Sequence, residues 1–387
     1  MKKNQLIILS VITLVAAIAA LVANNMKSNA VSNKAAGKAL FPALSANVNK
    51  VQEVEITKGK NIINIQRKDN TWQVVQKDGY TANLSKIKET ILKLAEFKTL
   101  EAKTKKQDNF GKLNVEDPTV DSAKSILVTL KGENNTTMAA LVVGKQLSGS
   151  VTAVGGEKTY VRKMGEDQVW LVAGGLLIDD LAIDWMDEQI MDIPDSRISK
   201  IVITPPKGKP VTIVKNKPED KEFMLMDLPK NKELKSTGEL TQTARLLQGL
   251  RMKDVSKAEK VDMSTNPNTK TDIYTFDGLV ISAVSMQKDS DHFITLDARF
   301  DATTRFTPPQ DPAPKQIPAP DGKAQPDSTA TSPSTASSPG TMLKPAAEVQ
   351  TEASALSEKL KPWTYTLSKS KGVAFIKTMD DLLKAKE

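Results

Sequence analysis

A pattern of apolar residues occurs twice in this chain, and it restricts the fold more than any other feature. Val54 and Ile56 alternate with polar residues in the first copy, and Ile201 and Ile203 do so in the second. A stripe of apolar residues at helical spacing follows in each copy: Ile87, Ile91 and Leu94, then Leu240, Ala244 and Leu247. Several elements that recur in the same order predict two tandem domains.

Alternating apolar residues separated by turn residues fill most of each copy, which is typical of antiparallel strands. The last strand of the first copy, 169–172, is matched in the second copy by 363–367. We therefore predict an α+β fold: an N-terminal transmembrane helix followed by two tandem repeats, each a mostly antiparallel β-meander with one or two helices. The predicted repeat domains are 48–195 for the first, and 196–306 plus 361–387 for the second.

A proline-rich segment interrupts the second copy. Residues 307–345 hold ten of the 20 prolines, together with Ser, Thr and Ala and without any aromatic residue. A segment of this composition buries too little apolar surface to offset the entropy of ordering. We predict a disordered insertion over 307–360, between two strands of the second repeat.

The N-terminus combines positive charge with a long apolar run. Lys2 and Lys3 precede residues 6–23, which carry no charged side chain. A helix of this length spans most of a bilayer core, and flanking lysines remain on the cytoplasmic side. Residues 1–23 are therefore predicted to anchor the chain in the inner membrane, with 24–47 as a tether and the bulk of the chain in the periplasm. The alternative is a signal peptide cleaved after Ala17-Ile18-Ala19, which has small residues at 17 and 19.

The charge balance bears on the choice of partner. The formal net charge is +8, but only seven of the 54 basic residues are Arg, and aromatic residues make up 4% of the chain. Base recognition and base stacking favour Arg and aromatic side chains, so the composition indicates a solvated basic surface and no nucleic-acid partner. The absence of Cys excludes disulfides, thiolate metal sites and a Cys nucleophile.

Residues suited to catalysis are few. His292 is the single histidine, and the alternation from Phe293 to Leu296 favours an ordinary strand position over a catalytic base. None of the glycine pairs has the spacing of a phosphate-binding loop. The sequence therefore predicts that the protein is not an enzyme, with no catalytic residue and no cofactor-binding or metal-binding residue.

An acidic run between the two copies is the strongest charge feature: Asp179, Asp180, Asp184, Asp187, Glu188, Asp192 and Asp195. Carboxylates at this density suit a divalent cation or an acid–base pair. The spacing of Leu177, Leu181 and Trp185 instead favours a solvated face on an amphipathic helix. Because the run lies between the copies, we predict a possible interface at the repeat junction formed by Asp179, Asp180, Asp184, Trp185 and Asp187.

Four short motifs resemble a known family: Asn70-Thr71-Trp72, Phe110-Gly111-Lys112-Leu113, Leu141-Val142-Val143-Gly144 and Tyr160-Val161-Arg162. They are similar to motifs of the bacterial envelope family called domain of unknown function 4340. The second copy departs from this pattern where Phe223 replaces the tryptophan. Members of this family occur alongside components of ABC-type export systems related to gliding-motility transporters, so the resemblance implies an accessory role. It brings no catalytic residues with it.

Three functions fit these observations. The leading hypothesis is a non-enzymatic, membrane-anchored periplasmic accessory protein, with the inner membrane and proteins of an ABC-type transport or envelope complex as its partners. The alternative is an extracytoplasmic binding module for a glycan or a lipid-linked envelope component, which a deep, aromatic-lined groove would favour. The third is a hydrolase that uses Asp180, Asp184 and Asp187.

Overall fold

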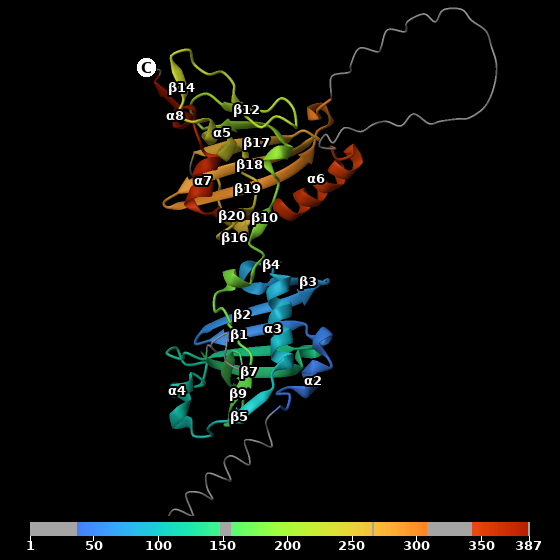
Figure 1. Ribbon diagram of the computed structural model, residues 1–387, viewed down its shortest axis with the longest axis vertical. Helices are drawn as coiled ribbons and strands as arrows, with labels where there is room; N and C mark the ends of the chain where they lie inside the picture. The colour runs from blue at the N-terminus through green and yellow to red at the C-terminus, as the bar shows by residue number, and fades with distance from the viewer. Residues whose placement is uncertain (1–36, 148–155, 265–266, 308–342, 386–387) are drawn as a thin grey trace, which may run out of the picture. The chain divides into compact units, whose positions relative to one another are not determined.

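The structure is a computed structural model that describes residues 37–147, 156–264, 267–307 and 343–385 (Figure 1). The chain forms two compact units, Met1–Asp187 and Glu188–Glu387. The sequence predicts the boundary between residues 195 and 196, whereas the structure has it earlier, between 187 and 188. Its cause is strand β10 (Gln189–Met191), which pairs with β15 (Leu250–Arg251) inside the second unit.

The first unit is built on one nine-stranded sheet in which every neighbouring pair is antiparallel, in the order β4-β3-β2-β1-β6-β7-β8-β9-β5. Its strands are β1 (Glu53–Lys58), β2 (Asn61–Lys68), β3 (Thr71–Val74), β4 (Tyr80–Thr81), β5 (Thr99–Ala102), β6 (Ile126–Lys131), β7 (Thr137–Leu147), β8 (Lys158–Lys163) and β9 (Val169–Ala173). Its helices are α2 (Pro42–Ser45), α3 (Leu84–Glu96) and α4 (Phe110–Leu113).

Helix α3 covers one face of this sheet (Figure 1). The Asn83 side chain accepts a hydrogen bond from the backbone N–H of Lys86 and so caps the first turn. The helix buries Ile87, Ile91 and Leu94, while β1 buries Val54 and Ile56. The apolar spacing that predicts this strand and this helix therefore also forms the core of the first unit.

The second unit contains an eight-stranded sheet, again antiparallel throughout, in the order β13-β12-β11-β17-β18-β19-β20-β16. Its strands are β11 (Ile198–Thr204), β12 (Val211–Val214), β13 (Met224–Leu225), β16 (Asp254–Lys257), β17 (Asn268–Thr275), β18 (Leu279–Lys288), β19 (Asp291–Phe300) and β20 (Trp363–Leu367). A separate pair joins β14 (Lys232–Leu234) to β21 (Leu383–Ala385), and the helices are α5 (Thr237–Ala244), α6 (Ala346–Leu360), α7 (Lys369–Phe375) and α8 (Met379–Leu382).

The two sheets have the same order of strands. Every strand of the second sheet has a counterpart at the same position in the first, so that β13-β12-β11-β17-β18-β19-β20-β16 corresponds to β3-β2-β1-β6-β7-β8-β9-β5. Strand β4 is the additional strand of the first sheet. The strand predicted at 363–367 is confirmed as β20, which lies between β19 and β16. It occupies the place that β9 has between β8 and β5.

The predicted fold class is wrong. The described residues form mostly antiparallel β-sheets with few helices, in place of an α+β chain that begins with a transmembrane helix. None of the helices in the described part of the chain is long and apolar enough to cross a membrane. The predicted anchor over 1–23 lies outside the described residues. The helices are few because most apolar residues alternate with period two and so specify strands.

The end of the predicted tether is part of the first unit. Leu40 and Leu44 are buried, and the backbone N–H of Leu40 donates to the carbonyl of Phe97 at 2.8 Å. Apolar side chains every fourth residue in this polar stretch anchor it beside α3 and β5. Residues 24–36 lie outside the described part of the chain.

The disordered insertion predicted over 307–360 is wrong for its last part, because Ala346–Leu360 forms helix α6. Val349, Ala353 and Leu360 are buried on the face of this helix that packs against β19. Pro345 precedes the first turn, where the missing N–H of proline costs nothing. Residues 308–342 lie outside the described residues.

A network of charged side chains fastens α6 to the sheet. The guanidinium of Arg197 donates to both carboxylate oxygens of Glu352 at 2.7 Å and to Asp277 at 2.8 Å. Lys344 also contacts Glu352, at 3.0 Å. The side chain of Asp277 is 3% exposed and that of Arg197 is 14% exposed, so the buried charge of Asp277 depends on Arg197 to be tolerated.

This network makes the second unit sensitive to acid. Burial acts to raise the pKa of Glu352, but hydrogen bonds from Arg197 and Lys344 outweigh it and hold the pKa below its ordinary value of 4.5. The resulting stabilisation is complete above that value and is lost as the pH falls through the lowered one. We expect the unfolding free energy of the second unit to fall by roughly 1–2 kcal/mol upon acidification. Thermal unfolding across a pH series will show a shallower dependence for Glu352→Gln.

Candidate functional site

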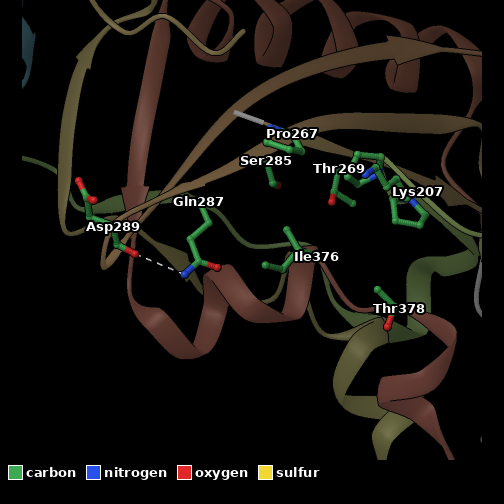
Figure 2. A pocket seen from close by; sticks show the side chains of 10 residues that line it. Lys207, Pro267, Thr269, Ser285, Gln287, Asp289, Ile376 and Thr378 are labelled. Atoms are coloured by element: carbon green, nitrogen blue, oxygen red, sulfur yellow. Dashed lines mark hydrogen bonds between the residues drawn. The ribbon is translucent and has the colours of Figure 1, made fainter. Parts of the chain in front are cut away.

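A pocket of about 540 Å³ opens on the second unit (Figure 2). The turn between β11 and β12 forms one wall, the adjacent ends of β17 and β18 form the floor, and the segment that joins α7 to α8 closes the far side. The residues that line it are Pro205, Pro206, Lys207, Pro267, Thr269, Ser285, Gln287, Asp289, Ile376 and Thr378.

The register of the sheet places the polar side chains of the floor. Thr269 of β17 and Ser285 of β18 are direct cross-strand partners, so their side chains project from the same face. Gln287 lies two residues beyond Ser285 and therefore shares that face. Figure 2 shows the side chain of Ser285 between those of Gln287 and Thr269, with Ile376 opposite.

Ser285 differs from Thr271, another hydroxyl residue of this face. It is 5% exposed, and its hydroxyl makes no hydrogen bond to any described residue. On the same face, Thr271 donates to the carbonyl of Phe375 at 3.0 Å. A buried hydroxyl without a partner costs about 1–3 kcal/mol, so such groups are rare and call for an explanation.

The corresponding positions in the first unit are apolar. Counting along β6 and β7 from the pairing of β6 with β1 places Ile126 and Val143 opposite each other, where Thr269 and Ser285 stand in the second unit. The two sheets share their strand order, so the fold itself does not require hydroxyl groups here. Thr269 and Ser285 are therefore specific to the second unit.

The pocket lining has little net charge. Of the described residues that line the pocket, Lys207 and Asp289 are charged, one of each sign, and the remaining polar groups are hydroxyls and the carboxamide of Gln287. That carboxamide donates to the backbone carbonyl of Asp289 at 3.4 Å. Nothing among the described residues activates Ser285 as a nucleophile, because no base is within hydrogen-bond reach of it. The chemistry of the lining suits binding.

The acidic residues predicted at the repeat junction all lie in the first unit, in the segment after β9. Asp180 pairs with Lys58 at 2.6 Å, and the hydrogen bond from Lys58 lowers the pKa of Asp180. Asp179 forms an ion pair with Lys86. No group of three potential metal ligands occurs in the part of the chain that the structure describes.

The helix that the spacing of Leu177, Leu181 and Trp185 favours is not formed. Only a short 3₁₀ turn, Ala182–Trp185, is present, and Leu177 and Leu181 are 79% and 57% exposed. Ion pairs to distant lysines hold the segment extended, and the two glycines before it do not favour a helix.

Trp185 is the anchor of this segment. Its side chain is fully buried, and the indole N–H donates to the carbonyl of Asp179 at 2.9 Å. The ammonium of Lys86 lies 4.7 Å from the ring centroid and donates to the carbonyl of Asp184 at 2.7 Å. The backbone N–H of Asp187 donates to the carbonyl of Thr81 at 3.0 Å. These contacts fasten the end of the first unit to α3 and β4.

His292 occupies the strand position that the sequence favours, in β19. The side chain is buried, and burial, with a further contribution from Lys369, lowers the pKa of His292. Gly372 of α7 packs directly on it, so a Cβ added at residue 372 would overlap the Cβ and ring of His292. The histidine thus serves as a neutral packing surface for α7.

We expect Gly372→Ala to destabilise the second unit by about 1–3 kcal/mol, because the added methyl overpacks the contact with His292. Gly111→Ala is the matched control, since that helical glycine has open space where the Cβ would stand. Thermal unfolding of both variants will measure the difference. Equal melting temperatures would contradict this account of the packing.

The fold defines a class of protein: two units, each built on a broad antiparallel sheet of the same strand order. Within that class the chain belongs to the family described as a domain of unknown function, DUF4340, whose sequence model matches residues 72–276, more than half of the chain. The match begins in β3 of the first unit and ends just after β17 of the second, and it confirms the family resemblance. No curated protein and no solved structure matches the chain.

Proposed function

We propose that the chain is a non-enzymatic accessory protein of the bacterial cell envelope that works beside an ABC-type transport complex. The proposal that the protein is not an enzyme is supported by the contacts of two candidate acid–base residues, Asp180 and His292. Asp180 is held ionised by Lys58, and His292 is buried under Gly372, so both act in packing and fastening. An ionised carboxylate in an ion pair is a poor general acid.

The proposed location rests on the sequence. Lys2 and Lys3 followed by the uncharged residues 6–23 favour attachment to the inner membrane, with the remaining chain outside the cytoplasm. The absence of Cys places no redox constraint on that compartment. The transport partners are what the resemblance to the family suggests.

Chemical crosslinking in intact cells, followed by purification from the membrane fraction, tests this proposal. We expect the full chain to be recovered from membranes with subunits of a transport complex attached. A chain that begins at residue 37 is the control, and we expect it to be released from the membrane. Recovery of the full chain solely as a free monomer after crosslinking would overturn the proposal.

A second candidate function, an extracytoplasmic binding module for a glycan or a lipid-linked envelope component, is favoured by the pocket on the second unit. Its floor carries the buried, unpaired hydroxyl of Ser285. Among the described residues, none that lines this pocket is aromatic, so the described lining offers no stacking surface to a ligand. Retention of the full chain on immobilised envelope glycans or on lipid-linked precursors would support this candidate, and no retention on either would reject it.

A further inference from the structure

We infer that the pocket on the second unit binds a short neutral glycan, with Ser285, Thr269 and Gln287 as the hydrogen-bonding residues. This inference rests on the second candidate function above and assigns it a site and a ligand class. It does not depend on the proposed transport partner.

The polar groups of the floor match sugar hydroxyls. A serine or threonine hydroxyl both donates and accepts hydrogen bonds, and the carboxamide of Gln287 offers a donor and an acceptor on one side chain. Sugar hydroxyls likewise both donate and accept, and a pyranose ring carries several of them on neighbouring carbons. Hydroxyl-bearing groups placed side by side on one sheet face therefore suit a ligand with several adjacent hydroxyls.

The walls complement the other surface of a sugar. Pro205, Pro206, Pro267 and Ile376 present saturated carbon, which contacts the C–H faces of a pyranose ring without aromatic stacking. Within the described part of the lining, the cation Lys207 is balanced by the carboxylate Asp289. A phosphate or a polyanion would find no excess of positive charge there, so the ligand is neutral.

The volume of the pocket and the unpaired hydroxyl of Ser285 also support a small ligand that bears hydroxyl groups. A volume of about 540 Å³ is within the usual range for small-molecule pockets. The hydroxyl of Ser285 is buried without a partner at a position where the first unit has Val143. A ligand hydroxyl that reaches the floor would satisfy it, which explains a serine at the end of the apolar positions Ile281 and Ala283 of the same strand.

Titration calorimetry with maltotriose and with the trimer of N-acetylglucosamine tests this inference on the full chain. We expect at least one of the two sugars to bind, and Ser285→Ala and Ser285→Val to weaken that binding at least tenfold. Both variants should keep or raise the melting temperature, because each removes a buried unpaired polar group. Val is the residue type that the first unit has at the equivalent position, so Ser285→Val is compatible with the fold.

Ser354→Ala is the matched control, because this exposed serine of α6 lies outside the pocket and should leave sugar affinity unchanged. If the full chain binds a sugar and Ser285→Ala binds it equally well, the site is wrong while the second candidate function stands. If neither sugar binds, the inference is overturned. Binding of a neutral peptide in place of sugar, with loss in Ser285→Ala, would assign the pocket to a peptide and also overturn it.

Discussion

A chain that ends at residue 342 is expected to have an unfolded second unit and a folded first unit. The deletion removes β20, which lies between β19 and β16, and it removes the helix that covers β19. Trp363, Tyr365 and Leu367 are all buried. The loss of a single large core side chain costs about 3–5 kcal/mol, and the loss of three exceeds the net stability of most domains.

Hydrogen exchange measured by mass spectrometry will separate the two units. We expect full amide protection in β1 and β6 of the truncated chain, and loss of protection in β17, β18 and β19. The control is a chain in which 310–342 are replaced by a short Gly-Ser linker, where both units stay protected, since loop length enters stability only logarithmically. Native protection of β19 in the truncated chain would contradict the central position assigned to β20.

Arg197→Met is the point substitution with the largest expected effect, a loss of about 3–5 kcal/mol from the second unit. Asp277 is buried beside the guanidinium, and Glu352 accepts two hydrogen bonds from it. Without Arg197, the buried carboxylate of Asp277 loses its ion-pair partner, and α6 loses its bidentate ion pair to the sheet. Denaturant unfolding monitored by circular dichroism will measure the change.

Arg245→Met provides the comparison. Arg245 pairs with Asp195 at 2.9 Å in the same unit, but its side chain is 58% exposed. Solvent screens such a pair, so its loss is expected to cost less than about 1 kcal/mol. The account of the Arg197 network fails if the two substitutions have the same effect.

Much of the sheet architecture could be predicted because the relevant signal is local. The alternation at Val54 and Ile56 specifies which face of β1 is buried, and the same alternation at 363–367 identifies β20 despite the long segment before it. The transmembrane helix predicted over residues 6–23 lies outside the described residues.

The rest depends on contacts between residues far apart in the chain. Helix α6 is rich in Ala and Glu, which favour helices, but it follows a proline-rich segment whose composition predicts disorder, and its burial depends on distant residues. It is fixed by Arg197, which lies 155 residues from Glu352. In the same way Lys58 and Lys86 hold the acidic segment extended, against the helical spacing of its leucines.

The candidate site was missed, although one signal for it exists in the sequence. Ser285 continues the buried alternation of Ile281 and Ala283, so it stands where an apolar residue is expected. A polar residue in phase with a buried strand face is a pattern worth testing, but the prolines that complete the pocket come from distant turns.

The interior position of β20 has a consequence for biosynthesis. A chain made from its N-terminus completes the first sheet once β9 has emerged, whereas the second sheet has a missing interior strand until residue 367 is made. During that interval β16 has no neighbour, and the outer edge of β19 carries unpaired backbone groups that recruit other strands. Each nascent chain therefore passes through a stage that invites aggregation, and a ribosome that stops before β20 releases a product that needs a chaperone or a protease.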